Sequence, residues 1–271
     1  MGAEVGALDV LGGDAKDVAG ASEVGAVDAA TYADGDGATK DRPPIGALDA
    51  STLDMGGETW AGSFSCPLPA THDSGVTQQL CYDFSDPASA ADFTPEAGTW
   101  EVSDGTYNAT APAAQVTCPG GAFGGSGMTA SVLNNLSAQD VRVHALMTSV
   151  LGPDKELVLR SRPGGNRIEL NFRANFTYQG VAQGGDLYIS ELVDCVNSAY
   201  VDVGTILIPH AVGQAIAVDV ELIGQHLTVV VDGNQVFDNT LSVSTVAGSV
   251  GFAVFRDEQT VFDDLLVDVL K

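Results

Sequence analysis

The stretch that decides the fold is Ala215–Asp268, which begins AIAVDVELI over residues 215–223 and continues HLTVVV over residues 226–231. Within the first segment, apolar residues at every second position alternate with acidic ones. That alternation is the period of a β-strand with one buried face and one solvated face. Both segments are therefore predicted to be strands of an antiparallel meander.

Two short turn sequences separate these strands from their neighbours. Gly224-Gln225 suits a type II′ hairpin turn, and Asp232-Gly233 suits a type I′ turn, because aspartate and glycine tolerate the positive φ that type I′ requires at both central positions. Two more apolar segments, residues 248–255 and 261–270, are predicted to be strands that complete the meander.

Composition agrees with a β architecture. The chain has 271 residues, of which 45% are hydrophobic and 17% charged, and it contains 32 glycines. No long amphipathic helix stands out, so many strands joined by tight turns are expected. Further strands are predicted over residues 140–147, 156–162, 167–173, 186–193 and 199–208. So many strands of this length predict an all-β fold, a two-sheet antiparallel β-sandwich.

The formal net charge is −25, from 11 basic and 36 acidic side chains. Such a surface repels phosphate backbones, so no nucleic-acid partner is expected. The sequence contains no run of about 18 apolar residues, so no transmembrane segment is expected either.

Residues 1–58 differ in composition from the rest of the chain. They are rich in Ala, Gly and Asp and repeat the pattern Gly-Ala-Leu/Val-Asp, with too few large apolar side chains to form a core. This part is predicted to be a disordered tether, and residues 59–271 the sandwich domain. An acidic tether suits an exported bacterial surface lipoprotein whose leader is absent from this chain, so an extracellular or cell-surface location is expected.

Three blocks of sequence stand out: the opening DFSD (83–86), the segment GTWEVSDG (98–105), and the closing segments VVVDGNQV (229–236), GSVGF (248–252) and FDDLLV (262–267). Together they resemble the concanavalin A-like lectin/glucanase jelly rolls, in particular laminin G-like and 3-keto-disaccharide-hydrolase-like domains. The resemblance implies a jelly-roll fold over about residues 80–270 but no particular activity. The leading hypothesis is a non-catalytic carbohydrate-binding or adhesive module whose partner is a glycan or cell-surface polysaccharide. The alternatives are a glycan-cleaving enzyme of the 3-keto-disaccharide-hydrolase type and a structural domain without a ligand.

The four cysteines are even in number and include no Cys-x-x-Cys pair, which disfavours a zinc ribbon. In an exported protein they would form two disulfides. Of the three possible pairings, locality favours Cys66–Cys81 with Cys118–Cys195. Four buried free thiols are the alternative that applies to a cytosolic protein.

No catalytic residues are predicted. Family 16 glucanases of this fold carry Glu-x-Asp-x-x-Glu on one strand, which sets two carboxyl groups at the separation that a retaining mechanism needs. That spacing is absent here. Asp219 with Glu221 are interpreted as a solvated strand face, and Glu191 with Asp194 would point to opposite faces. No transition-metal site is expected from the scattered histidines.

One strand carries a row of polar residues. Arg167, Glu169, Asn171 and Arg173 occupy alternate positions and are predicted to share one face, opposite Ile168, Leu170 and Phe172. Such a row is either an in-strand ion-pair ladder or the floor of a sugar-binding groove. It resembles the Arg-x-Glu-x-Arg strand of alginate lyases, but the partner motifs of that family are missing.

Aromatic residues flank a glycine-rich loop over residues 179–185. Phe176, Tyr178 and Tyr188 could stack on sugar rings, while the glycines would allow a ligand close approach. The alternative is that these three aromatic residues belong to the core or to its rim.

A structural Ca²⁺ is the predicted cofactor. Many jelly rolls of this type hold calcium where the first and last strands pair, and carboxylate oxygens are its preferred ligands. The resemblance points to Asp83 and Asp86 on the opening strand and to Asp263 and Asp264 on the closing strand. Solvated acids at the end of a sheet are the alternative.

Overall fold

The computed structural model of the protein describes residues 75–111, 128–194, 196–200, 206–255 and 257–271. The predicted tether and its boundary at residue 58 lie outside the described residues, as do Cys66, Cys118 and Cys195. Among the helices of the described residues, none is both long and apolar enough to cross a membrane.

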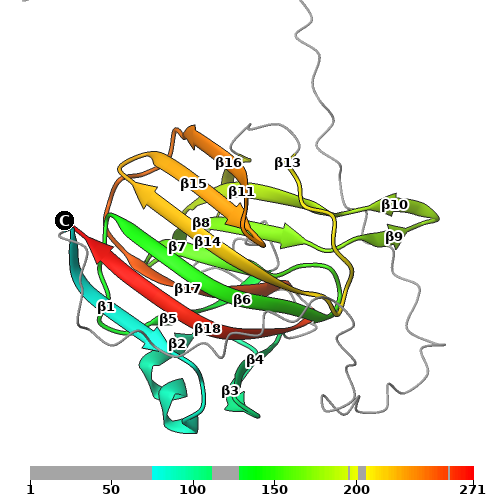
Figure 1. Cartoon of the computed structure of the whole chain (residues 1–271), viewed down its shortest axis with the longest axis horizontal. Helices are drawn as coiled ribbons and strands as arrows, with labels where there is room; N and C mark the ends of the chain where they lie inside the picture. The colour runs from blue at the N-terminus through cyan, green and yellow to red at the C-terminus, as the bar shows by residue number, and fades with distance from the viewer. Residues whose placement is uncertain (1–74, 112–127, 195, 201–205, 256) are drawn as a thin grey trace, which may run out of the picture. The chain divides into compact units, whose positions relative to one another are not determined.

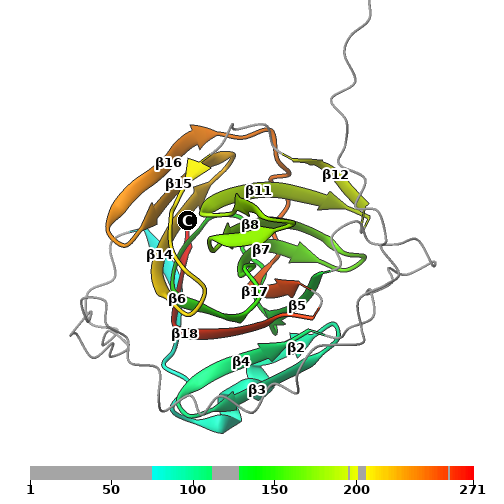
Figure 2. The ribbon, with the colours of Figure 1, turned by 90° about the vertical axis from the view of Figure 1, so that its right-hand side faces the viewer.

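Two eight-stranded antiparallel sheets stack on each other, which confirms the predicted two-sheet sandwich (Figures 1 and 2). Sheet A contains, in spatial order, β16 (Asn234–Thr240), β15 (His226–Val231), β14 (Ala215–Ile223), β6 (Val141–Leu151), β18 (Gln259–Leu270), β4 (Thr106–Thr110) and β3 (Thr99–Ser103), and β1 (Val76–Tyr82) also pairs with β18. Sheet B contains β12 (Val196–Tyr200), β11 (Asp186–Val193), β8 (Asn166–Arg173), β7 (Glu156–Arg162), β17 (Ser249–Phe255), β5 (Met128–Leu133) and β2 (Phe93–Pro95), and β13 (Ile206–Leu207) pairs with β11.

Two small elements stand outside these sheets. The 3₁₀ helix η2 (Pro87–Asp92) is capped by the Asp86 side chain, and β9 (Phe176–Tyr178) forms a hairpin with β10 (Val181–Gln183). Of the predicted strand over residues 199–208, the structure describes the end of β12 and the two residues of β13.

The predicted alternation decides which side chains enter the core. Val218, Val220 and Leu222 on β14 are each 1% exposed, and β14 pairs with β6, whose apolar residues at every second position face the same way. Burial of apolar area of this kind contributes about 25 cal/mol per Å² removed from water.

The hairpin turns have the expected backbone geometry. At Gly224-Gln225 only the glycine has a positive φ, of 57°, as a type II′ turn requires, while Asp232 and Gly233 have φ of 50° and 76°, as type I′ requires. Local sequence thus fixes the register of the β14–β15–β16 meander.

Aromatic rings connect the sheets through the core. Phe252 on β17 stacks on Phe262 on β18 with ring centroids 4.1 Å apart, so this pair joins sheet B to sheet A. A second aromatic group surrounds Tyr107, whose hydroxyl hydrogen-bonds Ser131 Oγ at 2.7 Å. Its members are Tyr82, Phe84, Phe93 and Trp100.

A buried guanidinium also joins the sheets. Arg160 on β7 is 1% exposed and donates hydrogen bonds to the backbone carbonyls of Gln139, Gly224 and Ser244. Gln139 precedes β6 and Gly224 forms the β14–β15 turn, so one sheet B side chain holds two connections of sheet A.

The face of sheet B that points away from the core carries the polar row predicted from the sequence. We call it the outer face of sheet B. Its middle is lined by small residues: Gly251 on β17 lies so close to β5 that a Cβ atom there would be 2.1 Å from the carbonyl oxygen of Ser131. Buried Ala130, Val158 and Ala253 pack together on the same face.

Candidate functional site

The polar row on β8 lies on the outer face of sheet B, as predicted. Ile168, Leu170 and Phe172 point into the core at 2%, 0% and 0% exposure. The four intervening polar residues share the opposite face, and each is held by neighbours from other segments. The row divides into two groups with different partners.

The first group is an ion-pair ladder. Arg167 Nε donates to Glu169 Oε1 at 2.7 Å, and Arg167 Nη1 donates to Glu96 Oε1 at 2.9 Å. Burial opposes the guanidinium charge, but Glu169 and Glu96 outweigh it and raise the pKa of Arg167. Because Arg167 and Glu169 are 4% and 2% exposed, this half of the row matches the ladder interpretation.

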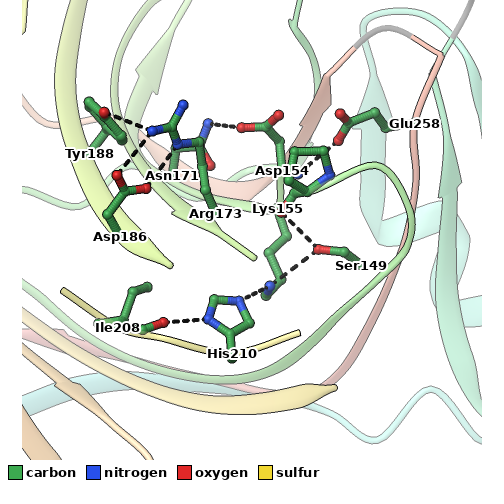
Figure 3. Close-up of polar contacts among 11 residues, drawn as sticks. Ser149, Asp154, Lys155, Asn171, Arg173, Asp186, Tyr188, Ile208, His210 and Glu258 are labelled. Carbon is green, nitrogen blue, oxygen red and sulfur yellow. Dashed lines mark hydrogen bonds and ion pairs between the residues drawn. The ribbon is translucent and has the colours of Figure 1, made fainter. Parts of the chain in front are cut away.

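The second group surrounds Arg173 (Figure 3). Its guanidinium donates to both carboxylate oxygens of Asp186, at 2.9 and 3.0 Å, and to the Tyr188 hydroxyl at 2.7 Å. The guanidinium carbon lies 4.1 Å from the centroid of the Tyr188 ring and 5.8 Å from that of Phe176. Tyr188 is 38% exposed, so the stacked pair reaches the surface.

Phe176 begins the β9–β10 hairpin beside this group. It lines a surface pocket of about 310 Å³ together with Asn175, Thr177, Ala182, Gln183 and Gly184. Gly184 has a φ of 77°, and a Cβ atom there would lie 2.1 Å from the carbonyl oxygen of Ala174, so the loop closes tightly on β8. Tyr178 lies on β9, but its side chain is outside the described part of the structure.

Two carboxyl groups that the sequence did not single out border the row. Asn171 Nδ2 donates to Asp154 Oδ1 at 2.6 Å, and the amide of Asp154 donates to Glu258 Oε2 at 2.8 Å. Burial, then the neighbouring Asp154 carboxylate, raises the pKa of Glu258 to about 10, and burial also raises the pKa of Asp154. At neutral pH Glu258 is therefore a protonated acid beside Asp154.

A third carboxyl group, Glu156, is fully buried on the same face. It lies directly across from Asn171 on β8 and from Ala253 on β17. Among the described residues neither Glu156 oxygen has a hydrogen-bond partner, and Asn171 Oδ1 has none either. Burial, followed by repulsion from Glu169 and Asp154, raises the pKa of Glu156 well above its usual value.

On the core side of the same segment, Lys155 is completely buried. Its Nζ donates to Ser149 Oγ at 3.2 Å and to Nε2 of His210, whose Nδ1 donates to the Ile208 carbonyl oxygen at 2.6 Å. Burial lowers the pKa of Lys155 to about 7, and burial followed by the Lys155 charge lowers the pKa of His210 to about 4. This cluster belongs to the interior, because its members point between the sheets.

The residues predicted for calcium gather at a different place. Asp83 Oδ1 accepts hydrogen bonds from Ser85, Asp86 caps η2, and both line a surface pocket of about 350 Å³. Burial, then Asp264 and Asp83, raises the pKa of Asp263 to about 6. No group of three or more His, Cys, Asp or Glu side chains in the described ranges could hold a metal ion, so calcium stays a prediction.

Two other predictions concern residues away from the row. Asp219 and Glu221 lie on sheet A, where Asp219 Oδ1 is 2.7 Å from His144 Nδ1 and Glu221 forms an ion pair with Arg142 at 2.8 Å, which fits a solvated strand face. Of the four cysteines only Cys81, on β1, belongs to the described residues, so the disulfide pairing stays a prediction.

No family model matches the chain, and no curated protein matches it. Among solved structures, it is similar to a carbohydrate-binding module from Bacillus subtilis, at 16% identity and a TM-score of 0.52 over 65% of this chain and 95% of that one. It is also similar to a native glycosidic hydrolase, at 10% identity and a TM-score of 0.50 over 72% of this chain and 97% of that one. At such low identity the likeness shows the fold alone. The two-sheet sandwich described above is therefore a concanavalin A-like jelly roll.

Proposed function

We propose that this protein is a non-catalytic carbohydrate-binding module whose ligand, a glycan or cell-surface polysaccharide, lies on the outer face of sheet B. The observation that carries the proposal is the group formed by Arg173, Asp186, Tyr188 and Phe176. Aromatic faces pack against the C–H surfaces of sugar rings, and charged planar groups fix the hydroxyls.

The position of this group supports the proposal. Tyr188 and Phe176 flank a guanidinium that Asp186 holds with two hydrogen bonds, and Phe176 lines a pocket of about 310 Å³. A site with its side chains already fixed loses little conformational entropy on binding. The carbohydrate-binding module and the glycosidic hydrolase among the similar folds are consistent with this proposal.

A glycan array with the whole chain tests the proposal. We expect binding to at least one glycan class, and we expect Tyr188→Ala and Phe176→Ala each to weaken it about tenfold or more, since loss of a stacking aromatic costs about 1–3 kcal/mol at binding sites that stack rings. Ile223→Ala is the control, because Ile223 is 46% exposed at the end of β14 in the other sheet. Absence of binding to every glycan would support a structural domain instead.

A second candidate is glycan cleavage, and Glu258 is the observation that favours it. Glycosidases pair a protonated carboxylic acid with a second carboxyl group, and Glu258, whose pKa burial raises to about 10, lies beside Asp154 near the group of Arg173, Tyr188 and Phe176. Sugar release from a bound polysaccharide, abolished by Glu258→Gln and reduced by Glu169→Gln, would promote this candidate over the binding module.

Two further sequence predictions are proposals as well. The acidic composition of residues 1–58 and the glycan ligand together suit an exported, surface-anchored bacterial protein. A structural Ca²⁺ held by Asp83, Asp86, Asp263 and Asp264 would relieve the repulsion from Asp264 and Asp83 that adds to burial in raising the pKa of Asp263.

A further inference from the structure

Three buried polar oxygen atoms stand together on the outer face of sheet B without hydrogen-bond partners. They are the two carboxyl oxygens of Glu156 and Oδ1 of Asn171, and none of them has a partner among the described residues. Glu156 and Asn171 face each other across the β7–β8 pair, which brings their side chains within about 5 Å of each other. Buried polar atoms without hydrogen-bond partners are rare in folded proteins, so this arrangement points to a group that the protein does not itself supply.

Most of the ionisable groups around these oxygens are acids. Carboxyl groups outnumber guanidinium groups among the described residues of this face, and both guanidiniums already have carboxylate partners, at Asp186 for Arg173 and at Glu169 and Glu96 for Arg167. The groups that act electrostatically on Glu156 are Glu169 and Arg167 on β8, Asp154 before β7, and Glu258 between β17 and β18. Apart from Arg167, all of them are acids.

From these two observations we propose that the glycan bound on this face carries free amino groups, and that Glu156 and Asn171 receive one of its ammonium groups. A primary ammonium has three N–H donors and no acceptor, and it brings the positive charge that the acidic cluster lacks. A neutral sugar hydroxyl has one donor instead of three and carries no positive charge.

The Glu156–Asn171 site lies next to Tyr188, so a ligand bound at Tyr188 can extend to it. Asn171 is also the cross-strand partner of Tyr188, and both Asn171 and Asp154 are partly exposed beside the buried Glu156. A sugar ring stacked at Tyr188 would thus present a substituent to Asn171. The inference rests on the proposed carbohydrate-binding function and specifies its ligand class as amino sugars that are not acetylated.

The test uses three β-1,4-linked oligosaccharides of equal length, made of glucosamine, N-acetylglucosamine or glucose, which differ only at carbon 2. Calorimetric titration of the whole chain should show the glucosamine oligomer binding about ten- to a hundredfold more tightly than the other two, as expected for a hydrogen bond to a charged group. Glu156→Gln should remove most of this difference.

The matched control is Asp219→Asn, because it makes the same exchange of a carboxyl group for an amide on the outer face of sheet A. An acidic protein attracts polycations without specificity, and equal losses in both variants would mean such attraction and would overturn the proposal. If Glu156→Gln does not fold, titrations of the wild-type protein in different buffers still test the proposal. Ionisation of Glu156 by the ammonium releases a proton, so the binding enthalpy should vary with the ionisation enthalpy of the buffer.

The outcomes separate the two proposals. Equal affinity for all three oligosaccharides contradicts the amino-sugar inference and leaves carbohydrate binding standing. No binding to these oligosaccharides or to any glycan on the array contradicts both.

Discussion

The backbone amide of Asp154 donates a 2.8 Å hydrogen bond to Glu258, and the two carboxyl groups also hydrogen-bond to each other. Asp154 precedes β7 of sheet B, and Glu258 precedes β18 of sheet A, so a single acidic pair connects the starts of strands in both sheets. A Cβ atom on Gly152 would lie 2.1 Å from the Glu258 carboxyl carbon, which shows how closely the backbone surrounds this acid.

The first prediction concerns the pH dependence of stability at Glu258. Because the folded-state pKa of Glu258 is about 10 and the reference value is 4.5, the folded state holds this proton more tightly. Its contribution to stability is complete below 4.5 and is lost as pH rises towards 10. The free energy of unfolding of Glu258→Gln, measured with urea, should therefore rise relative to the wild type between pH about 5 and about 9.

Glu101→Gln on β3 is the control for this series, because Glu101 is exposed. A constant difference between Glu258→Gln and the wild type across that pH range would show that Glu258 is ionised in the folded protein.

The second prediction concerns Lys155, whose pKa burial lowers from 10.5 to about 7. Between these values the unfolded chain binds a proton that the folded protein does not, so stability falls as pH drops from 10.5 to about 7. Lys155→Met should lack this slope, although it should cost stability overall by leaving His210 Nε2 without its donor. Urea unfolding at several pH values measures both effects, and exposed Lys271→Met should keep the wild-type slope.

The third prediction separates charge from geometry at Arg173. Lysine keeps the charge but cannot pair with both Asp186 oxygens or stack its head group on Tyr188 as a planar guanidinium does. Arg173→Lys should therefore weaken glycan binding by roughly tenfold. Arg142→Lys makes the same exchange at an ion pair on sheet A, 2.8 Å from Glu221, and should leave binding unchanged. Similar glycan affinities of Arg173→Lys and Arg142→Lys would show that Arg173 does not belong to the binding site.

The fourth prediction tests the close approach of strands at Gly251. Because an added Cβ atom would meet the Ser131 carbonyl at 2.1 Å, Gly251→Ala should force β17 and β5 apart. The expected loss is about 1–3 kcal/mol in the free energy of unfolding, typical of overpacking. Gly75→Ala is the matched control, since nothing lies within 4 Å of a Cβ atom at that position. Equal stability of the two variants would contradict the packing described for β17.

The fifth prediction concerns calcium. If Asp83, Asp86, Asp263 and Asp264 hold Ca²⁺, adding calcium should raise the melting temperature, with a stabilisation of about 2.7 kcal/mol at a hundred times the dissociation constant. Asp263→Asn should abolish the shift, and Asp238→Asn on exposed β16 should preserve it. A melting temperature that does not respond to millimolar calcium would end this proposal.

The fold could be predicted because its signals are local. The alternation in residues 215–223 and the turn pairs at 224–225 and 232–233 each involve only a few neighbouring residues, and the structure confirms all of them. The shared face of Arg167, Glu169, Asn171 and Arg173 follows from the same two-residue period.

The acidic part of the candidate site could not be predicted, because its members come from distant segments. Asp154 and Glu258 are 104 residues apart, and Lys155 and His210 are 55 apart. Glu156 offered no signal either, since the segment after it is apolar at every position up to Leu159 and does not say which face is the core. A search for catalytic carboxylates spaced along one strand therefore missed three acids that two sheets bring together.

Arg160 gives the sandwich a mechanical property as well as stability. Peeling sheet A from sheet B beside the β14–β15 turn would require the hydrogen bonds from Arg160 to Gln139 and Gly224 to break, in addition to any loss of core packing. A force that separates the sheets at this point would load these bonds in parallel, and parallel bonds rupture at higher force than bonds that open one after another. The hydrogen bonds of Arg160 would therefore help the two sheets to stay together in a protein that binds a polymer in a flowing liquid.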